Sequence, residues 1–216
     1  MVQFFLYRGG ISILIMKKLT LLFLLGLFTT VLHAQDKKIS IGLGPGVSIT
    51  NFKSGEDKSK GTGFNYFFNA FYKITPRISG GIEYEWVGVD LKFDYPPYDA
   101  AEIERTTITN ISIKGFYHFG NNDLRPYMGC GAGYYTVNPG KASFPNPLPN
   151  GPEKIVIEAE TKSAGGFAPE VGLNYKGFQV AALYHVVAGV DTSFSNDLIT
   201  YTNLEFRASY NIYFGF

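Results

Sequence analysis

The strongest constraint on this chain is a two-residue alternation of side-chain character, which is clearest at the C-terminal end. One set of alternate positions is apolar: Leu204, Phe206, Ala208, Tyr210, Ile212, Phe214 and Phe216. The positions between them are mostly polar and include Asn203, Glu205, Arg207, Ser209 and Asn211. Successive side chains of a β-strand point to opposite faces, so this pattern predicts a strand with one apolar and one polar face.

The same alternation recurs in seven earlier segments. Together with the last one, the predicted strands cover residues 38–51, 63–74, 77–93, 106–119, 125–138, 161–175, 177–191 and 199–216. None of these segments carries an apolar stripe of helical period. We therefore expect an all-β fold of eight strands.

The connections between the predicted strands alternate in length. Long connections cover 53–62, 94–105, 140–160 and 192–198, and short ones cover 75–76, 120–123 and 176–177. Outer-membrane barrels combine long extracellular loops with short periplasmic turns, and an even strand count returns the chain to its starting side. The sequence thus predicts an eight-stranded antiparallel up-and-down transmembrane β-barrel. We expect it in the outer membrane of a Gram-negative bacterium, with both termini periplasmic.

The polar faces of the predicted strands carry charges of both signs. They are Glu83, Glu85, Lys114, Glu170, Glu205 and Arg207, with Lys73 on the same side. An unpaired charge inside a narrow barrel is very costly, so we expect a structural network of ion pairs in the interior. Alternate glycines within 129–133 share one face, which leaves room there for Lys114 or Arg207.

The apolar faces carry aromatic side chains in two bands. Tyr117, Phe119, Tyr175, Phe214 and Phe216 fall near the short connections, and Trp86 falls toward the long ones. Lipid-facing aromatic girdles of this kind mark the two membrane interfaces of a barrel. The alternative is a soluble lipocalin-like lipid-binding barrel, which would turn its apolar faces inward.

An export signal precedes the predicted barrel. Met16-Lys17-Lys18 is followed by an apolar run that ends at Leu32 and then by His33-Ala34-Gln35. A basic start, a short apolar core and a small residue before the cut are the parts of a secretory signal peptide. We expect residues 1–34 to be a signal peptide with an upstream extension, the natural start being Met16. Residues 35–216 would form the mature outer-membrane β-barrel domain.

Composition and motifs exclude several classes of function. Cleavage after Ala34 leaves 16 basic residues (19 less 3) against 18 acidic ones, a net charge of −2 with no basic stripe for nucleic acid. The single cysteine, Cys130, excludes a disulfide framework. His118 and His185 lack metal-ligand spacing and are predicted to form hydrogen bonds in the interior. We expect no catalytic, cofactor-binding or metal-binding residue.

A lipid A-modifying outer-membrane enzyme is the alternative function. It would need a histidine, a serine and an acid within hydrogen-bond reach of one another near the outer rim. The nearest candidates are His185, Asp191, Ser193 and Ser195. The alternation places His185 on the interior side, so we expect the protein not to be an enzyme.

Three segments together resemble the small outer-membrane β-barrel superfamily of OmpA- and OmpX-type proteins. They are the Pro-Tyr-x-Gly-x-Gly-x-Gly-Tyr strand at 126–134, the strand and turn at 167–177, and the aromatic end at 210–216. The signal peptide and the aromatic richness look like a Bacteroidetes-type member. The resemblance implies a membrane-integrity role, or surface binding and adhesion through extracellular loops. The implied partners are outer-membrane lipid, the barrel-assembly machinery through the C-terminal strand, and a surface ligand.

Overall fold

The computed structural model describes residues 39–54, 57–92, 102–120, 122–145, 153–158, 160–192 and 195–214. The predicted signal peptide and Phe216 lie outside these residues. The described part of the chain holds no helix with the length and hydrophobicity of a membrane span.

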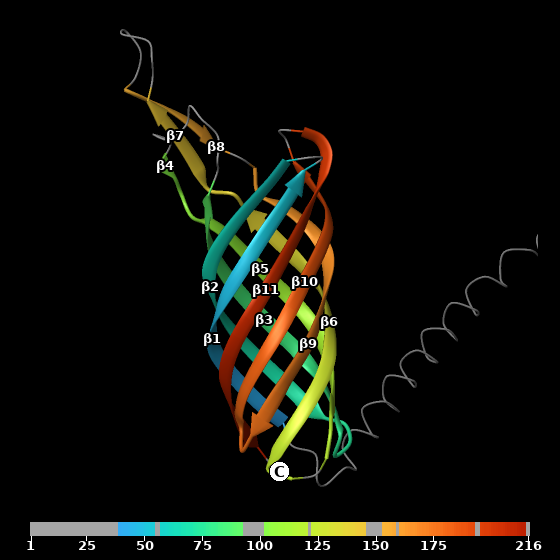
Figure 1. Cartoon of the computed structure of the whole chain (residues 1–216). Helices are drawn as coiled ribbons and strands as arrows, with labels where there is room; N and C mark the ends of the chain where they lie inside the picture. The colour runs from blue at the N-terminus through green and yellow to red at the C-terminus, as the bar shows by residue number, and fades with distance from the viewer. Residues whose placement is uncertain are drawn as a thin grey trace, which may run out of the picture. The chain divides into compact units, whose positions relative to one another are not determined.

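Within the described residues, eight long strands close into an antiparallel barrel (Figure 1). They are β1 (Ile39–Ser54), β2 (Asp57–Lys73), β3 (Ile78–Lys92), β5 (Thr106–His118), β6 (Leu124–Asn138), β9 (Lys162–Tyr175), β10 (Phe178–Thr192) and β11 (Ser195–Phe214). Each pairs with the strands before and after it in this series of eight, and the barrel closes where β1 meets β11, for example at Val47 and Phe206. The predicted fold class is confirmed.

Three short strands lie outside the barrel sheet, in segments for which we predicted loops. They are β4 (Glu102–Ile103), β7 (Lys141–Pro145) and β8 (Lys154–Glu158), and they pair in the order β4-β7-β8. The prediction of loops over 94–105 and 140–160 is wrong for these residues. The strands have two to five residues, which is too short for a two-residue alternation to reveal them. In the sequence, the barrel strands β5 and β6 also separate β4 from its partners β7 and β8.

The prediction of long loops at 53–62 and 192–198 is also wrong. β1 and β2 stay paired as far as Ser54 and Asp57, and β10 and β11 as far as Thr192 and Ser195. Ladder hydrogen bonds join backbone groups, so polar side chains in these segments did not prevent pairing. A tilted strand needs about 9–11 residues to cross a bilayer, and these strands are longer. Their polar ends therefore form hairpins beyond the apolar part of the barrel.

The short connections are as predicted, and the tightest joins β9 to β10. Lys176 and Gly177 both adopt positive φ angles, 49° and 93°. Two such residues in succession form the type I′ turn, whose twist matches that of a two-residue hairpin.

The two faces of the barrel are inverted relative to those of a soluble protein. Apolar residues point outward, and Ile113 is 72% exposed at the middle of β5. Charged residues point inward, and Glu85 is 0% exposed at the middle of β3. Only an apolar surrounding makes this arrangement favourable, because exposed hydrocarbon is costly in water and a buried charge is costly without partners.

The interior is layered along the barrel axis. On β5 the inward residues run from Phe116 through Lys114, Ser112 and Asn110 to Ile108. Two apolar layers therefore flank a polar centre. Phe71, Phe116 and Tyr127 form the layer near the short turns. The layer near the long connections contains Val87, Val89, Ile108, Tyr135, Val137, Ala164, Val187 and Tyr201.

Candidate functional site

Two basic side chains bind two carboxylates on the short-turn side of the polar centre. Lys114 Nζ lies 2.6 Å from Glu83 Oε1 and 3.0 Å from Glu170 Oε2. Arg207 donates from Nη1 to Glu83 at 2.7 Å and from Nη2 to Glu170 at 2.8 Å. All four side chains are at most 3% exposed, so this is a fully enclosed four-membered ion cluster.

The remaining space around these cations is filled by packing against neighbouring strands. The Arg207 guanidinium lies over the Phe67 ring, 4.2 Å from its centroid, a cation–π contact. The Lys114 stem occupies the space beside Gly131, where an added Cβ would stand 2.8 Å from Lys114 Cγ. Lys114 thus uses the room that the glycine strand was predicted to provide.

Glu85, His185 and Glu205 form a second cluster on the long-connection side of the first. His185 Nε2 lies 3.4 Å from Glu205 Oε2 and 3.6 Å from Glu85 Oε2. Tyr135 OH is 2.9 Å from His185 Nδ1. The two acids also accept hydrogen bonds from amides: Asn110 donates to Glu85 Oε2 at 2.5 Å, and Asn203 donates to Glu205 Oε1.

The two clusters differ in charge balance. Among the described interior residues, Lys114 and Arg207 are both committed to Glu83 and Glu170. Among the lysines and arginines that the structure describes, the one other approach to these acids is from Arg207 Nη1 to Glu85 Oε1, at 4.0 Å. Glu85 and Glu205 therefore face each other across His185 with less compensating charge than Glu83 and Glu170 have.

All six charges predicted for the interior lie in these two clusters. The tertiary structure adds His185 as a member of the second cluster, together with the orienting side chains Tyr135, Asn110 and Asn203. Each occupies an inward position of its strand, which the alternation indicates, but only the barrel register shows that it meets the acids. Lys73 is not part of either cluster.

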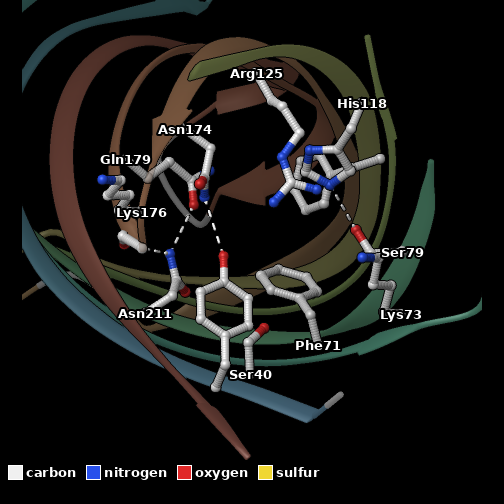
Figure 2. A pocket seen from close by; sticks show the side chains of 13 residues that line it. Ser40, Phe71, Lys73, Ser79, His118, Arg125, Asn174, Lys176, Gln179 and Asn211 are labelled. Atoms are coloured by element: carbon white, nitrogen blue, oxygen red, sulfur yellow. Dashed lines mark hydrogen bonds between the residues drawn. The ribbon is translucent and has the colours of Figure 1, made fainter. Parts of the chain in front are cut away.

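Lys73 instead lines a pocket of about 320 Å³ at the short-turn end. Figure 2 shows Arg125, His118 and Ser79 on one side of the pocket and Asn174, Gln179 and Asn211 on the other. Ser79 Oγ lies 3.0 Å from His118 Nε2, and Asn211 donates to Gln179 at 2.9 Å. Phe71 and Phe116 also line the pocket, and they belong to the apolar layer that covers the ion clusters. The pocket is thus a basic vestibule separate from those clusters.

The predicted aromatic girdle lies on the outer face where the structure describes it. Tyr117, Phe119, Tyr175 and Phe214 are 38–50% exposed near the short turns. Trp86 is partly exposed nearer the other end, where its ring stacks on Tyr66 with a centroid separation of 6.3 Å.

The residues considered for lipid A chemistry are not brought together in the described part of the chain. His185 is 2% exposed and points into the interior, with Tyr135 and two acids around it. The side chains of Asp191, Ser193 and Ser195 lie outside the described residues.

Comparisons with known proteins agree with this geometry. The model of a family described as "Outer membrane protein beta-barrel domain" matches residues 19–213. A comparison with curated proteins found no match.

Similar solved structures include three small barrels. Neisserial surface protein A is 14% identical over 79% of this chain and 96% of its own, with a TM-score of 0.46. Ail of Yersinia pestis, solved with the heparin analogue sucrose octasulfate, is 17% identical over 82% and 99%, with a TM-score of 0.46. OprG from Pseudomonas aeruginosa is 12% identical over 84% and 98%, with a TM-score of 0.48.

Proposed function

We propose that this chain, which belongs to the outer membrane protein β-barrel domain family, is a non-enzymatic barrel that supports the outer membrane and binds ligands at the cell surface. The observation that carries this proposal is the sealed interior. The described barrel has no open lumen. The surfaces left for function are therefore the apolar outer face of the barrel and the short strands β4, β7 and β8 outside the barrel sheet.

The interior argues against a pore function. Eight strands enclose only enough space for side chains. Here that space holds the two ion clusters, closed at one end by Phe71, Phe116 and Tyr127 and at the other by the layer around Tyr135 and Tyr201. Ion or solute passage would have to break buried ion pairs, so the barrel is expected to insert without porin-sized conductance.

The β4-β7-β8 sheet is the better candidate surface for ligand binding. The β4-β7-β8 sheet belongs to the connections at the end opposite the short turns. On β8, Ile155 and Val156 are 42% and 53% exposed, and Lys141 of β7 forms an ion pair with Glu158. β8 is an edge of this sheet among the described strands, and an exposed edge with apolar side chains can pair with an extended segment of a partner.

The orientation follows from the same proposal. Short turns on the periplasmic side would place both termini in the periplasm and the β4-β7-β8 sheet outside the cell. Residues 1–34 would be removed as a signal peptide, and the barrel-assembly machinery would recognise the C-terminal strand. The assignment to a Bacteroidetes-type organism stays a prediction.

The test separates support of the membrane from surface binding. A deletion strain is complemented with the full chain or with a variant in which a Gly-Ser linker replaces 141–158. Growth in detergent with EDTA reports membrane integrity, and surface protease treatment of intact cells reports exposure of this segment. We expect both proteins to restore growth, and only the full chain to show the protease-sensitive site.

Three results would contradict the proposal. They are porin-sized single-channel currents from the purified protein, a mass change in lipid A on expression that His185→Ala abolishes, and recovery of the protein in the soluble periplasmic fraction.

A further inference from the structure

We propose that Glu85, His185 and Glu205 bind a divalent transition-metal ion of the zinc class inside the barrel. The three residues come from β3, β10 and β11, and one ligand atom from each lies within 4.8 Å of the others. All three side chains are at most 2% exposed. The site is independent of the surface role proposed above.

The spacing of the ligand atoms suits tetrahedral coordination. Zinc binds histidine nitrogen and carboxylate oxygen at about 2.0–2.2 Å, which places neighbouring ligand atoms about 3.3–3.6 Å apart in a tetrahedron. His185 Nε2 lies 3.4 Å from Glu205 Oε2 and 3.6 Å from Glu85 Oε2. Both distances from His185 Nε2 thus fall in the range expected for tetrahedral zinc ligands.

Two unpartnered atoms face each other in the cluster. Within the described residues, His185 Nε2 and Glu205 Oε2 make no hydrogen bond, although both are buried and they lie 3.4 Å apart. A buried polar atom without a partner costs about 1–3 kcal/mol, and more when it is charged. Two such atoms facing each other in one enclosed cluster favour a cation between them.

The surrounding hydrogen bonds resemble those that orient metal ligands. Tyr135 OH holds His185 by Nδ1, which leaves Nε2 directed toward the acids. Asn203 donates to Glu205 Oε1, the oxygen that faces away from His185, and Asn110 donates to Glu85 Oε2, the oxygen that faces His185. Metal-binding histidines and carboxylates are commonly fixed by outer hydrogen bonds of this kind.

Charge balance favours a doubly charged ion. Glu83, Glu85, Glu170 and Glu205 carry four negative charges when ionised, and Lys114 and Arg207 carry two positive charges. Among these interior groups the excess is two negative charges, which one divalent cation neutralises. Nitrogen and carboxylate ligands suit Zn²⁺, and they also accept Mn²⁺ or Fe²⁺.

A proton is the competing occupant. His185 could carry a charge, or Glu85 and Glu205 could share a proton, without any metal. The two occupants differ in the amount of metal bound per folded chain, which the experiment measures.

The experiment refolds the full mature chain, without an affinity tag, from urea into detergent micelles with or without Zn²⁺. Folded protein is identified by heat-modifiable migration, passed over a chelating column, and analysed for metal by mass spectrometry. We expect about one zinc ion per folded chain, retained through the chelating step because the apolar layers enclose the site. Cobalt in place of zinc should give the visible absorption of a tetrahedral complex.

His185→Gln and Glu205→Gln should each reduce bound zinc at least tenfold. Glu170→Gln is the matched control, because it removes an equally buried acid that supplies no ligand atom, and it should keep more metal than either ligand variant. The wild-type result alone decides the proposal if a variant does not fold. Folded wild-type protein with less than a tenth of an ion per chain, or full zinc content in folded His185→Gln, would overturn it.

Discussion

Arg207 is the side chain whose removal should destabilise the barrel most. Its guanidinium bonds Glu83 and Glu170 at 2.7 and 2.8 Å and packs on Phe67, with the whole side chain 3% exposed. Arg207→Met keeps much of the volume and removes the charge. Among the described residues, Lys114 would then be the one basic partner left to these two buried carboxylates, with Tyr127 still donating to Glu170 at 2.8 Å.

Breaking a buried ion pair by removing one partner costs about 3–5 kcal/mol. For a urea dependence of about 2 kcal/mol per molar, the midpoint of unfolding should fall by about 2 M. The assay is urea unfolding of the barrel in lipid vesicles, followed by fluorescence of Trp86, the single tryptophan of the chain. Trp86 lies on the outer face, so its emission changes when it leaves the lipid.

The matched control is Arg105→Met. Arg105 also makes two hydrogen bonds to a carboxylate, that of Asp90, at 2.8 and 3.0 Å, but the two side chains are 42% and 62% exposed. Water screens such a pair, so its loss should change the midpoint little. Equal midpoint shifts for Arg207→Met and Arg105→Met would refute the conclusion that the interior cluster stabilises the barrel. Combining Arg207→Met with Glu170→Gln should cost less than the sum of the single changes.

Three further predictions concern the outer face, a turn and an exposed ion pair. Ile113→Arg, at the most exposed apolar position of mid-β5, should cost about 2–4 kcal/mol in vesicles and much less in a short-chain detergent; equal costs in both would contradict lipid contact. Gly177→Ala should lower the free energy of unfolding by about 1–3 kcal/mol in the same assay, because φ is 93° and the new Cβ would stand 2.7 Å from a carbonyl oxygen. Gly115→Ala is the control: no atom lies within 4 Å of the new Cβ, so the change should be nearly neutral. The hydrogen bond from Arg105 lowers the pKa of Asp90 below its ordinary value of 3.8, so the pair's small contribution to stability is present above that value and is lost as pH falls through the folded-state pKa. An NMR titration of the Asp90 carboxyl with a midpoint at or above 3.8 would contradict this.

The barrel strands could be predicted because their faces are a local property. A period of two needs only neighbouring residues, and strands such as β6 and β9 begin and end within a residue of the predicted bounds. Where the strands leave the apolar belt, polarity no longer distinguishes a strand from a loop. That is why the hairpin ends at Ser54–Asp57 and Thr192–Ser195 were predicted as loops.

The sequence by itself determined which side chains share a face of each strand, because alternation assigns each residue of a strand to one of two faces. It therefore placed Glu85, His185 and Glu205 on the polar faces, which we predicted to line the interior. Only the tertiary structure decided that they meet, because β3 is not a neighbour of β10 or β11 and contact across the barrel depends on closure and register. No spacing along the chain records that contact, so the cluster proposed to bind a metal is visible only after the barrel has closed.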